Sequence, residues 1–239
     1  MTGLHFVLML TERDVTIPDA MDVYQTVTGT GLRYVAFKDV GADHGMLGDL
    51  TGAAREDGLQ TLLEIADVTE AGQDAGVDLA LQLDVDIVVG TWRPESAAAL
   101  GSGGQPAYFP FVGSISGSPL QMHGGLADLA ADVSELAANA GVAGAVLMPY
   151  RQKEHSPGEL MSGVIRAADL PILVAGGVES SEQIVAIERA GAWGFTMGGG
   201  ALQHRHEDAG GVRRKVLETL ALCQFLESAS PGYGTKVVH

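Results

Sequence analysis

Lys38 has the most versatile chemistry of any residue in this sequence. It is one of four lysines and follows the apolar segment RYVAF, so a strand should carry it to the edge of a sheet. A lysine that is removed from water near carboxylates can act as a base, an electrophile or a Schiff-base nucleophile. The alternative is a structural ion pair with Glu64 or Asp39 that holds neighbouring strands together. Because side chains alternate along a strand, either Lys38 or Asp39 points inward, and the flanking residues leave this choice open.

Further polar residues fall where predicted strands end. Glu64 interrupts the apolar run TLLEIAD, where it either pairs with the lysine or acts as a general base. Tyr150 and Arg151 end the segment AVLMPYR, and Arg151 is a candidate to contact a sugar hydroxyl or a second anionic group, with a rim arginine as the alternative. Arg93 follows another strand. His123 lies in the Gly-rich segment SISGSPLQMHGG, which could close over a ligand, although a surface histidine is the more common case.

Two glycine clusters follow the last two predicted strands. PILVAGG ends in Gly176 and Gly177 and leads into a helix for which Ser180 is the expected N-cap. GFTMGGG contains Gly198 and Gly199 and leads into a short helical turn. Glycines let a backbone approach a phosphate closely, and helix N-termini supply N–H donors and the positive end of a dipole. Tight turns alone would explain one such cluster, but two at matching strand ends predict a phosphate site.

Short apolar segments alternate with amphipathic ones along the whole chain. The predicted strands are 4–10, 33–40, 59–66, 86–91, 107–112, 144–150, 171–175 and 193–197. The predicted helices are 18–28, 49–57, 69–83, 94–100, 126–140, 157–168, 181–190 and 212–228.

This rhythm predicts a single α/β domain, a TIM or (β/α)8 barrel with a closed parallel sheet over residues 1–228, followed by a tail at 229–239. Continuous apolar strands such as AGAVLM and PILVA indicate a parallel sheet that is covered on both faces. A doubly wound open sheet is the competing architecture. It usually has a Gly-rich turn after its first strand, where this chain has LTERDVTIPDA.

The composition restricts partners and compartment. The formal net charge is −16, from 30 acidic and 14 basic residues, and such a field repels nucleic acid and anionic membranes. A phosphate site must therefore rely on local donors. The single cysteine, Cys223, cannot form an intrachain disulfide and fits a buried helix face. The segment MTGLHFVLML has neither a basic region nor a cleavage site and is too short to span a bilayer, so we expect a cytoplasmic protein.

The segment 171–202, PILVAGGVESSEQIVAIERAGAWGFTMGGGAL, resembles the ribulose-phosphate-binding (β/α)8 barrel superfamily. This superfamily includes isomerases of histidine and tryptophan biosynthesis, thiamin phosphate synthase and hexosamine-phosphate epimerases. The resemblance implies phosphate-binding roles for Gly176, Gly177, Gly198 and Gly199. The remainder of the chain is similar only in its alternation of predicted strands and helices.

No subfamily fits the chain fully. Strand five, AYFPFVG, lacks the aspartate that histidine-pathway barrels carry there, and LEIADVT lacks the D-x-K-x-x-D cluster of the sugar-phosphate decarboxylases. Hexosamine-phosphate epimerases place a lysine on strand two, as Lys38 would be, and a glutamate on strand six. Strand six of this chain ends in Tyr150 and Arg151, so Glu64 would have to be the acid partner.

These features predict an isomerase or epimerase that acts on a small phosphorylated sugar or related carbonyl metabolite by proton transfer next to the carbonyl. The catalytic candidates are Lys38, Glu64, Asp39 and Arg151, and the candidates for substrate binding are Arg93, Tyr150 and His123.

Three alternatives stay open. The first is a class I aldolase or lyase in which Lys38 forms a Schiff base. The second is a non-catalytic barrel that binds a phosphorylated metabolite, and the third is a phosphate site that holds a flavin or nucleotide cofactor. We expect no cofactor because the chain has no Rossmann fingerprint, and no metal because His204 and His206 lack placed carboxylates. A homo-oligomer is compatible with the sequence.

Overall fold

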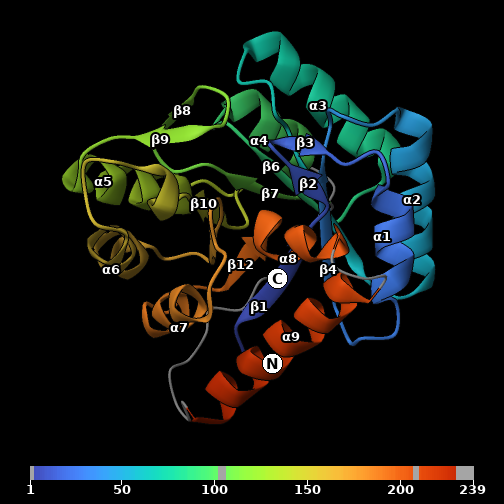
Figure 1. Ribbon diagram of the computed structural model, residues 1–239. Helices are drawn as coiled ribbons and strands as arrows, with labels where there is room; N and C mark the ends of the chain where they lie inside the picture. The colour runs from blue at the N-terminus through green and yellow to red at the C-terminus, as the bar shows by residue number, and fades with distance from the viewer. Residues whose placement is uncertain (1–2, 102–105, 207–209, 230–239) are drawn as a thin grey trace.

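The computed structural model describes residues 3–101, 106–206 and 210–229, which form a nearly closed (β/α)8 barrel (Figure 1). Its eight parallel strands are β1 (His5–Met9), β4 (Tyr34–Lys38), β5 (Gln60–Glu64), β6 (Ile87–Gly90), β7 (Ala107–Pro110), β10 (Ala145–Leu147), β11 (Ile172–Val174) and β12 (Gly194–Met197). They pair in the order β10-β11-β12-β1-β4-β5-β6-β7. A parallel bridge between Phe111 and Val146 joins the two ends of this sheet. The predicted barrel is therefore confirmed, and each predicted strand contains an observed one.

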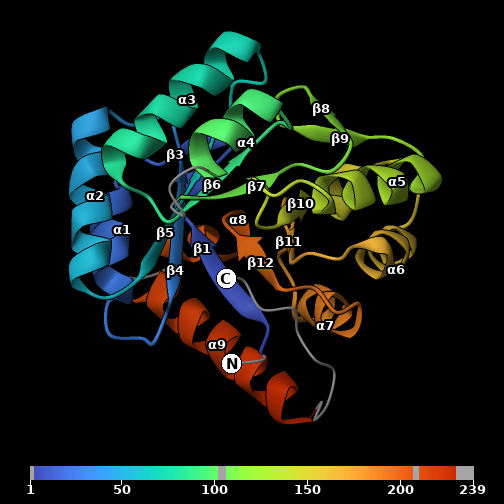
Figure 2. The ribbon, with the colours of Figure 1, turned by 180° about the vertical axis from the view of Figure 1, so that it is seen from behind.

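Helices surround the strands on the outside of the barrel (Figures 1 and 2). They are α1 (Ala20–Val27), α2 (His44–Glu56), α3 (Glu70–Leu83), α4 (Pro94–Gly101), α5 (Leu126–Ala137), α6 (Pro157–Ala167), α7 (Ser181–Arg189) and α9 (Gly211–Ala229), while the short helix α8 (Gly199–Leu202) follows β12 at the carboxyl end of the barrel. Helix α2 begins earlier than the predicted helix at 49–57. The reason is local, because the side chain of Asp43 accepts a hydrogen bond from the N–H of Met46 and caps the helix there.

Aliphatic side chains fill most of the core. In β4 all five residues are buried, because one face of the strand points into the barrel and the other packs under the helices. At the amino-terminal end of the barrel, the rings of His5, Tyr34 and Trp193 pack against one another. Burial, assisted by the charge of Arg33, lowers the pKa of His5 to about 4. Cys223 is buried on α9, as predicted, and burial raises the pKa of its thiol to about 11.

Two short hairpins stand where the sequence analysis expected loops. The strands β2 (Thr11–Glu12) and β3 (Val15–Thr16) pair antiparallel directly after β1, and β8 (Ser114–Ser116) and β9 (Gln121–His123) pair after β7. Strands of two or three residues are too short to show the apolar–polar alternation that identifies a strand in a sequence. Both hairpins follow the carboxyl end of a barrel strand, which is the end where (β/α)8 barrels carry their sites.

The last described element of the chain is helix α9. Helix α9 extends to Ala229, just past residue 228, and the rest of the predicted tail, 230–239, lies outside the described residues. Within the described part of the chain, no helix combines the length and the hydropathy that crossing a bilayer requires.

Candidate active site

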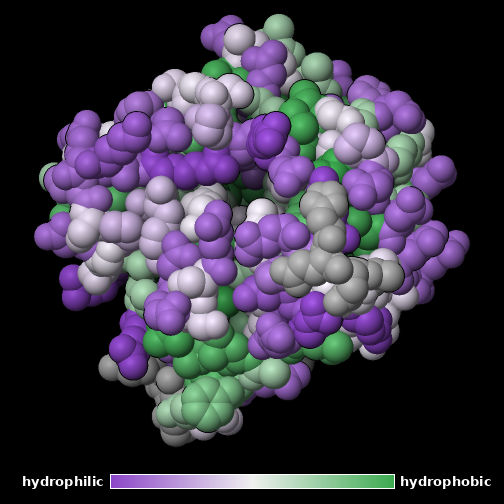
Figure 3. Space-filling model, in the orientation of Figure 1, coloured by the Kyte–Doolittle hydropathy of each residue, from purple (hydrophilic) through white to green (hydrophobic). Residues whose placement is uncertain are grey.

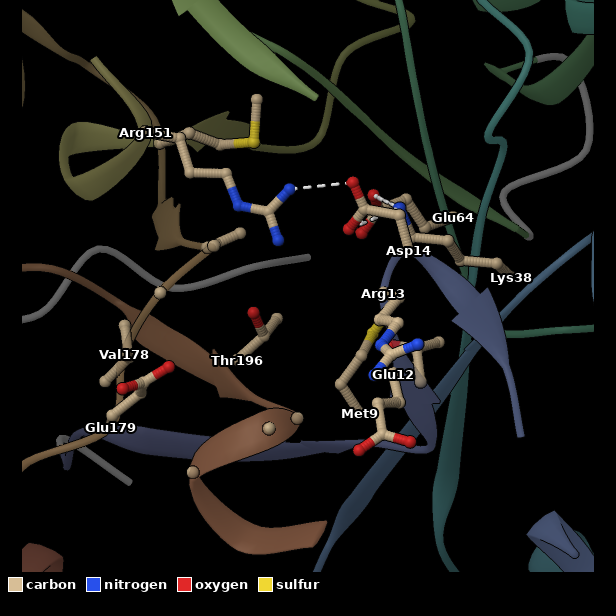
Figure 4. Close-up of a pocket in the computed structure, with 18 residues that line it drawn as sticks. Met9, Glu12, Arg13, Asp14, Lys38, Glu64, Arg151, Val178, Glu179 and Thr196 are labelled. Atoms are coloured by element: carbon tan, nitrogen blue, oxygen red, sulfur yellow. Dashed lines mark hydrogen bonds and ion pairs between the residues drawn. The ribbon is translucent and has the colours of Figure 1, made fainter. Parts of the chain in front are cut away.

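A cavity of about 200 Å³ lies at the carboxyl ends of the barrel strands, between the β2–β3 hairpin, the loop after β11 and helix α8. In the space-filling view the surface is hollowed near its centre, among mostly hydrophilic residues (Figure 3). The close-up shows charged side chains that reach into the cavity from several elements (Figure 4). The lining residues are Met9, Thr11, Glu12, Arg13, Asp14, Lys38, Glu64, Met148, Arg151, Ala175, Gly176, Gly177, Val178, Glu179, Thr196, Gly198, Gly199 and Gly200.

Lys38 is the last residue of β4, and its side chain points into this cavity (Figure 4). Its Nζ atom lies 2.8 Å from Oε1 of Glu64 and 3.4 Å from Oδ1 of Asp14. Lys38 is only 3% exposed and Glu64 is 8% exposed, so the ion pair is almost completely removed from solvent. Of the two residues between which strand alternation left a choice, Lys38 is therefore the one that faces the barrel mouth.

Asp14 occupies the second position of the two-residue turn in the β2–β3 hairpin. Arg13 and Asp14 have φ angles of 52° and 63°, which is the left-handed pair that a tight two-residue hairpin turn requires. This turn places the Asp14 carboxylate beside Lys38 and Arg151. Burial by itself would raise the pKa of Asp14, but the hydrogen bond from Arg151, the charge of Lys38 and the N–H of Leu120 together outweigh it and lower the pKa below the ordinary value.

Arg151 lies in a 3₁₀ turn, Pro149–Arg151, that directly follows β10. Its Nη1 atom donates hydrogen bonds to Oδ2 of Asp14, at 2.8 Å, and to the carbonyl oxygen of Leu120, at 3.3 Å. The arginine also packs against Gly176, where a Cβ atom would stand 2.8 Å from its Nε atom. Arg151 therefore connects the acidic side of the cavity with its glycine-rich side.

The four glycines predicted from the sequence all line this one cavity. Gly176 and Gly177 have φ angles of 76° and 82°, a conformation that side chains other than glycine rarely adopt. Gly198 is the N-cap of α8, and a Cβ atom there would stand 2.9 Å from the carbonyl oxygen of Thr11. At Gly199, by contrast, nothing lies within 4 Å of the position of a Cβ atom. The two glycine clusters therefore line the same cavity, and we refer to these four residues as the glycine wall.

Helix α7 begins at the predicted cap. The side chain of Ser180 accepts a hydrogen bond from the N–H of Gln183, and the side chain of Gln183 accepts from the N–H groups of Ser180 and Glu179. These contacts use the N–H groups of Glu179, Ser180 and Gln183 within the chain, and no residue of α7 itself lines the cavity. Backbone donors for an anion in the cavity must come from the loop at Gly176 and Gly177 and from the segment that begins α8.

Four predicted site residues lie outside the cavity lining. Asp39 accepts a hydrogen bond from the N–H of Ala66, and burial raises the pKa of its carboxyl. Arg93 pairs with Asp74 on the outer surface. Tyr150 is half-buried behind Gly177. His123 bonds Ser116 across the β8–β9 hairpin and lines a separate groove that also contains Trp92 and Asp128.

Several lining residues were not chosen as site candidates from the sequence. Asp14 and Arg13 follow the first strand, but no pattern in LTERDVT indicated a hairpin that turns them inward. Glu12 lines the cavity and pairs with Arg205 at 3.0 Å. Thr11, Thr196 and Glu179 are further polar lining residues of this kind. Among the residues that the structure describes, no three His, Cys, Asp or Glu side chains gather as metal ligands.

Comparison with known proteins identifies the fold. No model of a known protein family matches the chain, and no curated protein sequence matches it either. Among solved structures, thiamine phosphate pyrophosphorylase from Pyrococcus furiosus superposes with a TM-score of 0.63 at 15% identity, over 95% of this chain and 98% of that one. The native structure of KDPGal gives a TM-score of 0.70 at 13% identity, again over 95% and 98%. The YdjI aldolase from Escherichia coli K12 gives 0.62 at 12% identity, over 96% and 94%.

These identities are low, so the likeness supports the architecture alone. The class of protein that fold and comparisons define is the (β/α)8 barrel. The resemblance to one superfamily of these barrels and its phosphate site stays a prediction.

Proposed function

We propose that the chain is an enzyme that isomerises or epimerises a small phosphorylated sugar or a related carbonyl metabolite by proton transfer next to the carbonyl. One observation carries the proposal: the buried Lys38–Glu64 pair and the glycine wall belong to the same cavity of about 200 Å³. Pockets for drug-sized ligands are commonly about 300–1,000 Å³, so this cavity suits a smaller molecule. A ligand with a carbonyl at one end and a phosphate at the other matches both sides of it.

The phosphate binds to backbone N–H groups of the two glycine loops. Gly176 and Gly177 have no side chain between their backbone and the cavity, and their positive φ angles are ones that glycine adopts without strain. In α8 the N–H groups of Ala201 and Leu202 bond the carbonyl oxygen of Gly198, so the backbone donors for the phosphate are the N–H groups of Gly199 and Gly200, beside the open space at Gly199. This wall needs no lysine or arginine to form, which agrees with the low content of basic residues.

Two arginines offset the charge that a phosphate brings into this acidic protein. Arg151 lies directly against Gly176. Arg13 lines the cavity, is exposed, and forms no ion pair with another residue of the described ranges. The charge of Glu12 is balanced by its ion pair with Arg205. Glu179 is exposed to solvent, which weakens its repulsion of an anion.

The Lys38–Glu64 pair performs the proton transfer. The Glu64 carboxylate removes a proton from the carbon next to the carbonyl. The Lys38 ammonium, fixed in place before the reaction, stabilises the enediolate oxygen that develops. Return of the proton to the neighbouring carbon gives an isomer. Protonation of the opposite face of the original carbon, by a second acid, gives an epimer.

A Schiff-base aldolase or lyase is the second candidate function, and the burial of Lys38 beside Glu64, a carboxyl group able to exchange protons during imine formation, is the observation that favours it. In that reaction the neutral amine of Lys38 attacks the carbonyl carbon, and the resulting carbinolamine loses water to form an imine, with a nearby carboxylic acid donating the proton to the departing hydroxyl. Treatment with borohydride separates the two mechanisms. A reduced adduct on Lys38, located by peptide mass spectrometry, would establish the imine, and its absence during turnover favours enediolate chemistry.

Binding is tested by thermal shift with a panel of three- to six-carbon aldose and ketose phosphates, each beside its unphosphorylated counterpart and inorganic phosphate. A ligand that binds the native state raises the Tm in proportion to the logarithm of its excess over Kd. We expect phosphorylated ligands to raise the Tm while the unphosphorylated ones do not. If both raise it equally, or neither does, the phosphate assignment fails. A ligand that binds without any turnover would instead support the non-catalytic barrel.

A further inference from the structure

The Asp14 carboxylate has partners on both oxygens, and these partners come from three separate parts of the barrel. Oδ1 lies 3.4 Å from Nζ of Lys38 on β4. Oδ2 accepts one hydrogen bond from Nη1 of Arg151, after β10, and another from the N–H of Leu120, each at 2.8 Å. Because these contacts occupy both oxygens, Asp14 is poorly available as an acid or base for a ligand. Its contacts instead hold the side chains of Lys38 and Arg151 and the backbone of Leu120 in place.

Leu120 belongs to the turn of the β8–β9 hairpin, and its two backbone groups face the same pair of side chains. Its N–H donates to Asp14, and its carbonyl oxygen accepts from Arg151 at 3.3 Å. The Leu120 side chain is buried, at 5% exposure. The tips of the two hairpins, which are far apart in the sequence, are thus joined beside the cavity through one charged hydrogen-bonding group.

Arg151 is held in one orientation by these contacts. Its Nη1 atom is directed to Asp14 and Leu120, while its Nε atom and aliphatic stem lie against Gly176. Figure 4 shows the guanidinium directed toward the Asp14 carboxylate, with Thr196 below it in this view. A flexible arginine would lose side-chain entropy on binding an anion, and an arginine that is already ordered avoids much of this cost.

We propose that Asp14 is a positioning residue that docks the β8–β9 hairpin at the cavity and orients Arg151 toward the bound ligand. The ligand part of this inference rests on the proposed function, whereas the docking part does not. Without the carboxylate, the N–H of Leu120 loses its charged acceptor and Arg151 loses its main hydrogen-bond partner. Lys38 keeps Glu64, so the other ion pair of the cavity stays in place.

Hydrogen exchange measures the docking directly. Asp14→Ala should speed exchange in the peptide that covers residues 114–123 by about tenfold, because the loss of a hydrogen bond to a charged group favours local opening. Glu12→Ala is the matched control. It removes a carboxylate from the same β2–β3 hairpin, and the partner of that carboxylate, Arg205, is not a partner of Asp14. If Asp14→Ala leaves exchange within twofold of the wild type, the docking role is wrong. If Glu12→Ala speeds it equally, the effect is not specific to Asp14, which also overturns the proposal.

A double-mutant cycle then tests whether Asp14 acts through Arg151. We expect Asp14→Ala and Arg151→Ala each to reduce the rise in Tm caused by the best phosphorylated ligand, and the double variant to be no worse than Arg151→Ala alone. Additive losses would show that Asp14 acts on the ligand independently and would contradict the positioning role. Asp14→Asn should restore part of the exchange protection, because its amide oxygen still accepts from Leu120, but little of the ligand effect. Full restoration of both by Asp14→Asn would show that the charge is dispensable and that the role is merely structural.

The two proposals fail in different ways. If no phosphorylated ligand raises the Tm of the wild type, the proposed function fails, and the exchange experiment still decides the docking role. If ligands bind normally to Asp14→Ala, the proposed function stands and the orientation of Arg151 by Asp14 is rejected.

Discussion

Lys38 and Glu64 occupy equivalent positions on neighbouring parallel strands, and their charged groups meet at 2.8 Å in the floor of the cavity. They end β4 and β5, so the sheet register itself sets their separation. A pair placed by a sheet register is held more rigidly than one carried on loops. Proton transfer beside a carbonyl requires such fixed geometry, because small displacements of the reacting groups are costly.

Removal of one partner of this pair should destabilise the protein. Lys38→Met leaves the buried Glu64 carboxylate without its counter-ion, which should lower the free energy of unfolding by about 3 kcal/mol. Adding Glu64→Leu should recover most of this loss, because the unpaired charge is then removed. Urea unfolding at pH 7 measures both, with the exposed Lys153→Met as the control. A loss below about 0.5 kcal/mol for Lys38→Met, which is the range of ordinary surface substitutions, would contradict the burial of the pair.

A substitution in the glycine wall at Gly199 should abolish ligand binding while leaving stability nearly unchanged. Gly199→Ala places a methyl group in open space that belongs to the cavity, so we expect stability within about 1 kcal/mol of the wild type but loss of the Tm rise with phosphorylated ligands. Gly158→Ala on α6 also meets nothing within 4 Å but lies elsewhere, and it should leave both properties unchanged. Normal ligand binding by Gly199→Ala would place the anion somewhere else.

Gly176→Ala should instead lower stability. The residue has a positive φ angle, and its new methyl group would stand 2.8 Å from Nε of Arg151, so backbone strain and displacement of the arginine act together. We expect a loss of about 1–3 kcal/mol in urea unfolding. Stability equal to that of the wild type would mean that this loop readily adopts another conformation.

The pH dependence of stability should report the ion pairs of Asp14. Its pKa is lower in the folded protein than in the unfolded chain, so the stabilisation is fully present above the ordinary aspartate value of about 3.9 and is lost as the pH falls through the lower folded value. Urea unfolding from pH 7 to pH 3 should therefore show a smaller acid-induced loss for Asp14→Asn than for the wild type. An equal loss in both would show that the ion pairs of Asp14 do not contribute to the pH dependence of stability.

Asp39 should change stability with pH in the opposite direction to Asp14. Burial raises its pKa in the folded state, so ionisation of Asp39 weakens the fold as the pH rises above about 3.9. Asp39→Asn should gain stability relative to the wild type on going from pH 3 to pH 7. A relative loss over this range would indicate that its hydrogen bond with Ala66 outweighs the burial of the charge.

Arg13 should contribute binding energy rather than stability. It is exposed at the tip of the β2–β3 hairpin and lines the cavity, so Arg13→Gln should reduce the Tm rise with phosphorylated ligands while leaving the Tm of the free protein nearly unchanged. Arg189→Gln on α7 makes the same charge change away from this cavity and serves as the control. Equal reductions in the two variants would indicate a general effect of net charge.

The barrel was predictable because its signals are long and repeated. Eight apolar runs each had room for a strand, and the amphipathic segments between them had the period of helices. Ser180 was recognisable because a capping residue acts through its immediate neighbours. The start of α2 was missed because its cap, Asp43, precedes residues with little apolar character, and the hairpins were missed because their strands are too short to show a period.

The candidate site was predictable where one residue type carried the signal. Glycines at two strand ends and a lysine at the end of an apolar run indicated the residues that line the cavity. Asp14 could not be singled out, because its inward direction depends on a turn with two positive φ angles, and its partners Leu120 and Arg151 are more than a hundred residues away. Arg93 and Tyr150 were chosen because they lie at or just after the ends of predicted strands, and His123 because it lies in a loop. Neither kind of position determines which way a side chain points.

The central claim is proton transfer next to a carbonyl by the Lys38–Glu64 pair, and solvent exchange measures it most directly. The protein is incubated in D₂O with each aldose or ketose phosphate that raises its Tm, and ¹H NMR follows the signal of the proton on the carbon next to the carbonyl. We predict that this signal disappears with the wild type and persists with Glu64→Gln, although Glu64→Gln still binds the ligand. If the wild type binds these ligands and exchanges none of their carbon-bound protons, or if Glu64→Gln exchanges them as fast as the wild type, the claim is contradicted.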